Sequence, residues 1–489
     1  MLFNSHIFML LFLPLLLAGW YFLNWKKKFQ LAQGYLIGMS LWFYAYANLQ
    51  YLWLLLFSCL IGWLLSCLPE KISSEKGKKV LTGVGCVFHL GLLGYFKYSN
   101  FFLENLNTVF HTDFPMLQIL LPVGISFYTF QQLAYLIDRC RGDAPRDSFF
   151  DYLTFMVYFP QLLQGPILLR SEFMEQLKEP ERRRFHAERF SEGIQFFVFG
   201  LAKKVLLADT LAKAVNYGYS NVSMLDSISA LLLAVGYLTE LYFDFSGYCD
   251  MAVGLGKMIG LEVAENFDAP FHSASVKEFW RRWHMTLGRF FTRYVYIPLG
   301  GNRRGKMRTL CNVMIVMLLS GLWHGAAWTF VLWGFLHGVG MIWDNLEHPH
   351  LPKKWMRQAA TFAYVCMTFV FFRAESIAQG VDVLKSIVSL KWNGFVFQMA
   401  SALDLTEFYM ITKALSMKLP GLLSWFWLGI FVVLIAICFR VLSGEKVSGV
   451  VALQKQKGYG RLYPVLLAFL FTWSMISMTG VSEYLYFSF

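Results

Sequence analysis

The sequence predicts an all-α protein that crosses a membrane many times. Hydrophobic residues make up 57% of the 489 residues and charged residues only 15%, which is far from the composition of a soluble domain. Apolar runs of the length that a bilayer requires, about 20 residues, recur along the whole chain. Because backbone groups in a bilayer must be satisfied within their own segment, we expect each run to form a helix.

Twelve apolar runs are candidates for these helices. They cover 7–23, 31–48, 51–67, 80–97, 149–168, 194–208, 227–243, 308–323, 327–343, 358–372, 422–439 and 463–480. No linker, low-complexity tract or repeat divides the sequence. We therefore treat residues 1–489 as a single polytopic domain of a plasma membrane.

Lysines after the first run predict its orientation. Lys26, Lys27 and Lys28 are expected in the cytoplasm, which puts Met1 outside. The next basic loop, 70–79, comes two runs later and agrees with this assignment. The first run lacks a preceding basic stretch and a clear cleavage site, so we expect a retained anchor and not a signal peptide.

The net charge of +12 does not indicate nucleic acid. Basic residues flank the apolar runs, so anionic lipid headgroups are the expected partners. The eight cysteines lie mostly inside apolar runs and form no CxxC pair. We therefore expect neither disulfides nor a metal cluster.

Residues 280–294 have the pattern of an amphipathic helix lying on the membrane surface. His284 falls on the aromatic side of this helix, about 40° from Trp280, where a position near the headgroups is the simpler interpretation. The arginines are expected to anchor in lipid, although one could contact a phosphate-bearing donor. One face carries Trp280, Trp283, Leu287, Phe291 and Tyr294, and the opposite face carries Arg282, Arg289 and Arg293.

Three segments carry Pro or Gly at membrane depth: 121–130, 159–167 and 320–325. Broken backbone is tolerated in a bilayer only where protein shields it or where it lines a wet cavity. The breaks therefore predict a central chamber.

His324 is the leading catalytic candidate. It stands between Gly321 and Gly325 at the junction of two apolar runs, where backbone can approach a ligand closely. A histidine within membrane runs is by default taken as a functional residue. The alternative is a buried structural histidine bonded to a neighbouring carbonyl, which would give the same sequence pattern. Ser320 and Trp323 are expected beside it, lining the chamber.

His337 lies 13 positions after His324, a rotation of about 220° on a continuous helix. The two rings would not share a face, which disfavours a two-histidine metal site. His337 either links helices by hydrogen bonds or lines the chamber.

Glu240 and Asp244 are spaced i,i+4 in an apolar run and share a face. Buried carboxylates are costly unless paired or protonated. We expect a polar network that lines the chamber, with Arg or His partners.

Several catalytic signatures are absent. The sequence has no GxSxG elbow, P-loop or HExxH motif, and no aspartate follows a membrane histidine by four or five residues. This excludes the motifs of serine hydrolases, nucleotide hydrolases, zincins and soluble acyltransferases.

Taken together, six phrases resemble the membrane-bound O-acyltransferase (MBOAT) superfamily, and within it the bacterial alginate O-acetyltransferase membrane subunit and its relatives in cell-wall and exopolysaccharide acetylation. The phrases are "LPVGISFYTFQQLAYLID" (121–138), "FPQLLQGPI" (159–167), "DFSGYCDMAVGLGKMIG" (244–260), "FWRRWHMTLGRFFTRYVYIPLGGNRRG" (279–305), "SGLWHGAAWTFVLWGFLHG" (320–338) and the terminal "EYLYFSF". The similarity is weakest across 373–462.

The resemblance implies a helical bundle with a funnel or tunnel, re-entrant or broken helices, and a catalytic histidine at the constriction. The "LWHG" histidine maps onto His324, and the more variable second polar position of the family maps onto His284. Acetyl-CoA is the implied donor, and the implied acceptor is an extracytoplasmic glycan or partner protein. The form of "YIPLGGNRRG" argues against the branch that transfers D-alanine to teichoic acid.

On this hypothesis, a neutral His324 acts as general base on an acceptor hydroxyl. Trp323, Ser320, His337 or backbone N–H groups near Gly325 could stabilise the oxyanion. One alternative is a transporter or channel that uses His324, Glu240 and Asp244 as a relay. Another is a scaffold that only recruits a secreted acyltransferase.

Overall fold

A computed structural model of the protein is α-helical and has no strand among the residues that it describes. Those residues are 1–47, 49–346, 353–442, 446–458, 460, 462–478 and 484–485. The predicted fold class is confirmed. Of the terminal 483–489 phrase, only Tyr484 and Leu485 fall within these ranges.

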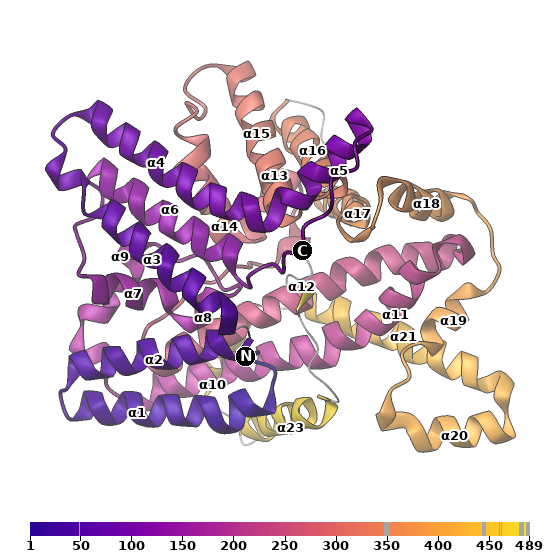
Figure 1. The fold of residues 1–489 in the computed structure, drawn as a ribbon. Coiled ribbons are helices and arrows are strands. Elements are labelled where there is room, and N and C mark those ends of the chain that lie inside the picture. The colour runs from indigo at the N-terminus through magenta and orange to yellow at the C-terminus, as the bar shows by residue number, and fades with distance from the viewer. Residues whose placement is uncertain are drawn as a thin grey trace.

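Three consecutive stretches of the chain hold the helices, and the colour in Figure 1 runs through them in order from indigo to yellow. The first comprises α1 (Leu13–Trp25), α2 (Phe29–Ala47), α3 (Leu52–Ser66), α4 (Glu75–Leu93), α5 (Ser99–Phe110), α6 (Ile125–Arg141), α7 (Phe149–Val157), α8 (Phe159–Leu162) and α9 (Arg170–Lys178). The second comprises α10 (Ala187–Ala202), α11 (Asp209–Ser220), α12 (Ser227–Ile259), α13 (Val276–Arg282), α14 (Met285–Phe291), α15 (Lys306–His324), α16 (Trp328–Asn345) and α17 (Lys354–Arg373). The third comprises α18 (Ile377–Val388), α19 (Phe395–Ser401), α20 (Tyr409–Lys418), α21 (Pro420–Leu442), α22 (Val447–Lys457) and α23 (Leu462–Ser477).

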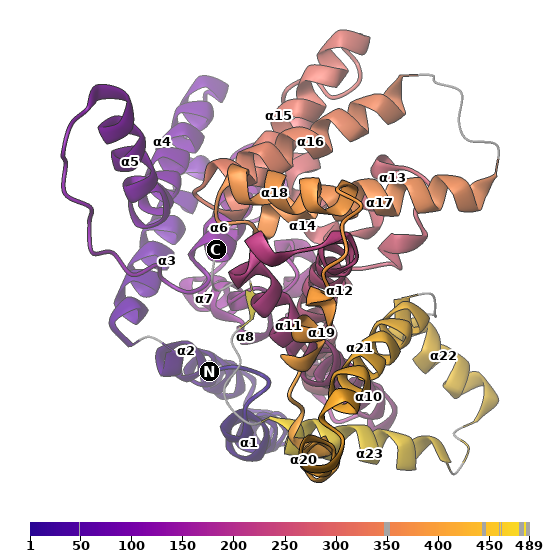
Figure 2. The same cartoon turned by 90° about the vertical axis from the view of Figure 1, so that its right-hand side faces the viewer.

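Helix α12 runs through the middle of the molecule (Figures 1 and 2), and it packs against α10, α11, α17 and α18. Two pairs of facing glycines, Gly193 with Gly254 and Gly200 with Gly247, bring α10 onto α12. A Cβ at any of the four would lie 2.5–2.7 Å from the facing carbonyl oxygen. Small residues therefore let these two backbones touch, as is typical of membrane helices.

Six helical stretches within the described ranges are long and apolar enough to cross a membrane. They are Phe8–Trp25, Leu49–Lys71, Glu75–Phe110, Ser227–Ile259, Lys306–His324 and Pro420–Leu442. These coincide with half of the twelve predicted runs.

The run at 149–168 is not a spanning helix. Helix α7 ends at Val157, and α8 is a single turn that begins at Phe159. Pro160 lacks the N–H that a continuous helix would need. Both pieces are buried within the protein, so their apolar character reflects protein packing and not lipid contact.

The surface helix predicted for 280–294 is also wrong. Helix α13 ends at Arg282, His284 has a left-handed φ of 46°, and α14 begins at Met285. Trp283 is 1% exposed and packs against Phe267 and Phe369. An apolar stripe on a helix does not reveal whether lipid or protein covers it, and here protein covers it.

The three arginines of that segment pair with carboxylates, contrary to the lipid anchoring expected from sequence. Arg282 bonds Glu278 at 2.9 Å, Arg289 bonds Glu172, and Arg293 bonds Asp138 at 3.0 Å. Two of these carboxylates come from distant parts of the chain, so the sequence pattern could not reveal them.

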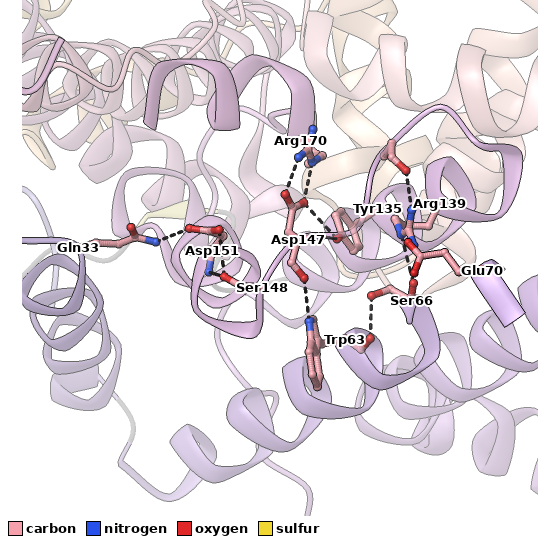
Figure 3. A network of polar contacts seen from close by, with 11 residues as sticks. Gln33, Trp63, Ser66, Glu70, Tyr135, Arg139, Asp147, Ser148, Asp151 and Arg170 are labelled. Carbon is pink, nitrogen blue, oxygen red and sulfur yellow. Dashed lines mark hydrogen bonds and ion pairs between the residues drawn. The ribbon is translucent and has the colours of Figure 1, made fainter. Parts of the chain in front are cut away.

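A buried polar network joins α3, α6 and α9 to the turn before α7 (Figure 3). The carboxylate of Asp147 accepts two hydrogen bonds from Arg170 and one from Tyr135, and its carbonyl accepts one from Trp63. Nearby, Arg139 donates to two backbone carbonyls and to Glu70. We call this set the Asp147 network; its members are Trp63, Ser66, Glu70, Tyr135, Arg139, Asp147 and Arg170.

Candidate functional site

His324 is the last residue of α15, at a sharp return of the chain. Gly325 and Ala327 are extended, and α16 begins at Trp328. The two helices pack closely, since a Cβ on Gly321 would lie 2.3 Å from the carbonyl oxygen of Phe330. Ser320, one turn before His324, is buried on α15. The predicted break at 320–325 is therefore the end of one helix against the start of the next.

Aromatic rings surround the His324 imidazole, which is 3% exposed. The centroids of Trp333 and Phe372 each lie 5.2 Å from its own. Trp323 packs edge-on against Phe127. These walls fix the ring and shield it from bulk solvent, which strengthens electrostatic effects at the site.

A small pocket of about 50 Å³ opens beside this imidazole. Its lining combines the end of α15 with segment 121–127, Leu163 and Lys97. Gly124 has φ 78°, and a Cβ there would lie 2.6 Å from the carbonyl oxygen of Leu162. The three predicted backbone breaks thus meet at one pocket, and His324 and Trp323 line it as expected.

His284 lies against His324, with ring centroids 6.4 Å apart. It is fully buried and packs on Phe245, which rules out the interfacial position considered from sequence. Its backbone is left-handed, a conformation that costs a non-glycine residue about 1–2 kcal/mol and that clusters at functional sites.

The tautomer of His284 follows from its bond to Asn266. Nδ1 lies 3.2 Å from Oδ1 of Asn266, and the same oxygen accepts from the backbone N–H and the hydroxyl of Thr286. Since Oδ1 acts as an acceptor, Nδ1 carries the hydrogen and Nε2 has the lone pair. Burial lowers the pKa of His284 to about 3, so the ring is neutral at physiological pH.

Asn266 also lines a second, much larger hollow of about 990 Å³. Cys249, Asp250, Glu265 and Lys446 contribute to its walls. Asn266 contacts His284, and His284 contacts His324, which borders the small pocket. The two histidines therefore lie between the two spaces.

His337 serves as a link between helices. Its Nδ1 accepts from the indole N–H of Trp280 at 3.2 Å, and its Nε2 lies 2.9 Å from the hydroxyl of Thr368. The ring is fully buried between α13, α16 and α17. Both nitrogens are engaged with protein, which corresponds to the interhelical role of the two left open by the sequence.

Asp244 and Glu240 are both buried on α12 in a second polar cluster, but neither is among the residues that line the small pocket or the large hollow, contrary to the expectation from sequence. Asp244 bonds Lys204 at 2.6 Å and accepts the backbone N–H of Leu485 at 3.0 Å. The expected Arg or His partner is thus a lysine, which a π-helical turn at Lys203–Ala208 directs toward α12. Phe245, the next residue after Asp244, packs against His284, so α12 connects this cluster to the histidines.

Two residues of the site were not singled out from the sequence. Asn266 orients His284, and nothing marks an asparagine in a loop as special. Lys97 lines the pocket, and it stands inside an apolar run at 80–97. A lysine within such a run was the available signal.

Comparisons with known proteins identify the family of the chain. The family model "MBOAT, membrane-bound O-acyltransferase family" matches residues 141–375. A peptidoglycan O-acetyltransferase of Helicobacter pylori is 35% identical over 423 residues, 80% of each chain. The probable alginate O-acetylase AlgI of Azotobacter vinelandii is 39% identical, covering 77% of this chain and 76% of its own. The corresponding protein of Pseudomonas aeruginosa is 38% identical, covering 77% and 73%.

The helical membrane fold together with these matches defines the class, a multi-pass membrane O-acyltransferase. The chain belongs to the membrane-bound O-acyltransferase family. This sets aside the transporter and scaffold alternatives.

Proposed function

We propose that the protein is an O-acetyltransferase of a bacterial inner membrane. It takes the acetyl group of cytoplasmic acetyl-CoA and passes it to a hydroxyl outside the cytoplasm, for O-acetylation of an exopolysaccharide or of the cell wall. The acceptor is the glycan itself or a partner protein that modifies it. The names of the relatives support the acetyl group and the glycan.

The observation that carries this proposal is the position of the histidine pair between two spaces. Segment 111–124 follows the stretch Glu75–Phe110, which begins in the basic loop, so the positive-inside rule puts the small pocket on the extracytoplasmic side. The large hollow reaches the loop 261–269. That loop contacts Gln176 in the charged region whose Arg183 bonds the carbonyl of Phe29, next to the Lys26–Lys28 cluster.

The reaction needs a proton acceptor where the two spaces meet. His324 removes the proton of the acceptor hydroxyl as its oxygen attacks the thioester carbonyl. The tetrahedral intermediate then collapses, the C–S bond breaks, and the imidazolium returns the proton to the leaving thiolate. Such general base catalysis contributes about 10²–10⁴-fold. Neutral His284, with Nε2 as an acceptor, helps to hold the reacting groups.

The test is complementation of a strain that lacks the gene. Wild-type protein should restore acetate that mild base releases from the extracellular polysaccharide or the cell wall. His324→Ala should abolish it at equal membrane abundance. His337→Asn is the matched control, because it removes a buried imidazole that only links helices, and it should retain acetylation.

A second arm identifies the donor. Inverted membrane vesicles with radiolabelled acetyl-CoA outside should accumulate base-labile label in the lumen. In the complementation experiment, restoration of base-released acetate by His324→Ala would overturn the assignment of His324 as the general base. Release of D-alanine in place of acetate would show instead the teichoic acid reaction.

A further inference from the structure

Side chains from one π-helical turn bind the last three carbonyls of α15. The turn, η4, spans Gly94–Tyr98 between α4 and α5. The hydroxyl of Tyr98 donates to the carbonyl of Leu322 at 2.5 Å. The ammonium of Lys97 donates to the carbonyl of Trp323 at 2.8 Å and to that of His324 at 2.9 Å. The end of the helix that carries His324 is therefore held from outside.

The end of α15 has a need for such donors. The final carbonyls of a helix have no intrahelical partner, and the helix dipole makes this end negative, which favours a cation. The extended backbone at Gly325 directs the chain away, so it cannot continue the ladder. Lys97 supplies both the donors and the charge.

A lysine here is costly, since it lies within a stretch that is apolar enough to cross a membrane. Its ammonium bonds two neutral carbonyls. A Tyr or Asn could cap carbonyls at lower desolvation cost, as Tyr98 does for Leu322. A lysine at this position, bonded to both carbonyls and lining the pocket, therefore indicates a role beyond capping.

That charge belongs to the wall of the small pocket. Lys97 and His324 line the same space of about 50 Å³, so a group that enters it lies near both. An ammonium has three hydrogens, and two of them are directed at the two carbonyls. This arrangement holds the third donor in place before the reaction, which is what makes electrostatic stabilisation effective.

We propose that Lys97 is the residue that stabilises the oxyanion of acyl transfer, fixing the end of α15 with two N–H groups and donating the third to the thioester carbonyl oxygen in the pocket. The inference rests on the proposed function. As the acceptor oxygen attacks, negative charge gathers on the carbonyl oxygen, and a hydrogen bond from the Lys97 ammonium stabilises it until the C–S bond breaks. Trp323, Ser320 and His337 were the side chains considered for this role from sequence, and His337 is already engaged with Trp280 and Thr368.

The experiment measures label transfer from radiolabelled acetyl-CoA in the vesicles described above, with purified protein checked by thermal unfolding. Lys97→Met should lower kcat about 10²–10³-fold, the usual loss for an oxyanion donor, and leave the KM for acetyl-CoA within about threefold of wild type. Lys97→Arg should recover much of the rate because it keeps the charge. Tyr98→Phe is the matched control, because it removes the neighbouring cap without changing charge and should retain kcat.

Wild-type kcat in Lys97→Met, or a loss confined to KM, would overturn the assignment. If Lys97→Met fails to fold, Lys97→Gln decides: it keeps a capping donor without the charge, so a rate like that of wild type would equally reject the proposal. Failure of the proposed function is distinguishable, because wild-type protein would then transfer no acetyl label.

Discussion

The Asp147 network and the His284–His324 pair both bury polar side chains among helices, yet they treat them differently. In the network each charged group is paired: Asp147 with Arg170, and Arg139 with Glu70. At the histidine pair the rings lie among aromatic residues; His324 lines the small pocket, and Asn266, the partner of His284, lines the large hollow. The comparison teaches that burial of polar groups alone does not indicate function; the functional candidates are the buried polar groups that lie next to a space.

The largest effect on stability should come from breaking the network. Asp147→Ala leaves Arg170 without its carboxylate at a site where the arginine side chain is 11% exposed, and losing one partner of a buried pair costs about 3–5 kcal/mol. Thermal unfolding in detergent measures this, and acyl transfer per folded molecule should not change. Asp382→Ala, in an exposed pair with Lys385, should cost less than about 1 kcal/mol. Equal losses would remove the distinction.

A methyl group at the return between α15 and α16 should lower both the stability of the protein and the transfer rate. Gly321→Ala adds a Cβ 2.3 Å from the Phe330 carbonyl oxygen, and such overpacking costs about 1–3 kcal/mol. It also displaces His324, so the transfer rate should fall. Gly91→Ala, where a Cβ meets nothing within 4 Å, should stabilise α4 by about 0.5–1 kcal/mol. A normal rate in Gly321→Ala would show that the return tolerates movement.

A smaller change should follow from freeing the ring of His284. Asn266→Ala removes the oxygen that sets its tautomer, and we expect kcat to fall about tenfold, which equals about 1.4 kcal/mol of barrier. Asn266→Asp keeps an acceptor and should recover part of the rate. Steady-state kinetics on both variants decide this, and an unaffected alanine variant would exclude an orienting role.

The smallest effect is a dependence of stability on pH. His284 has a pKa of about 3 when folded and about 6.5 when unfolded, so between these values only the unfolded chain binds the proton. Stability should therefore fall as pH decreases, by about 0.7 kcal/mol from pH 7 to pH 6. His284→Asn keeps a residue type that accepts left-handed backbone and should flatten the slope. Unfolding midpoints across this pH range measure it; an equal slope in both proteins would contradict the assignment.

The sequence was sufficient to predict the helical class and the breaks. Clusters of glycine and proline at membrane depth marked the three segments that meet at the pocket, and His324 stood out as a histidine between two glycines within apolar runs. These signals depend only on neighbouring residues in the sequence, so they can be recognised without knowledge of the fold.

What the sequence could not predict depends on distant partners. The stripe at 280–294 looked lipid-facing because Glu172 and Asp138, the partners of its arginines, lie more than a hundred residues away. The lysine partner of Asp244 and the role of Asn266 could not be predicted for the same reason, because each depends on a contact with another part of the chain. Neither periodicity nor spacing encodes which helix packs where.

One wide turn sets the geometry around Lys97. A π-helical turn holds one more residue than an α-helical turn, so η4 lets α4 stay against α6 while Lys97 and Tyr98 reach α15. Deleting a single residue there would rotate one side of the helix by about 100° relative to the other. Anyone who shortens this protein or joins it to a relative must therefore match residue counts between Glu75 and Phe110, because chain length is there a part of the chemistry.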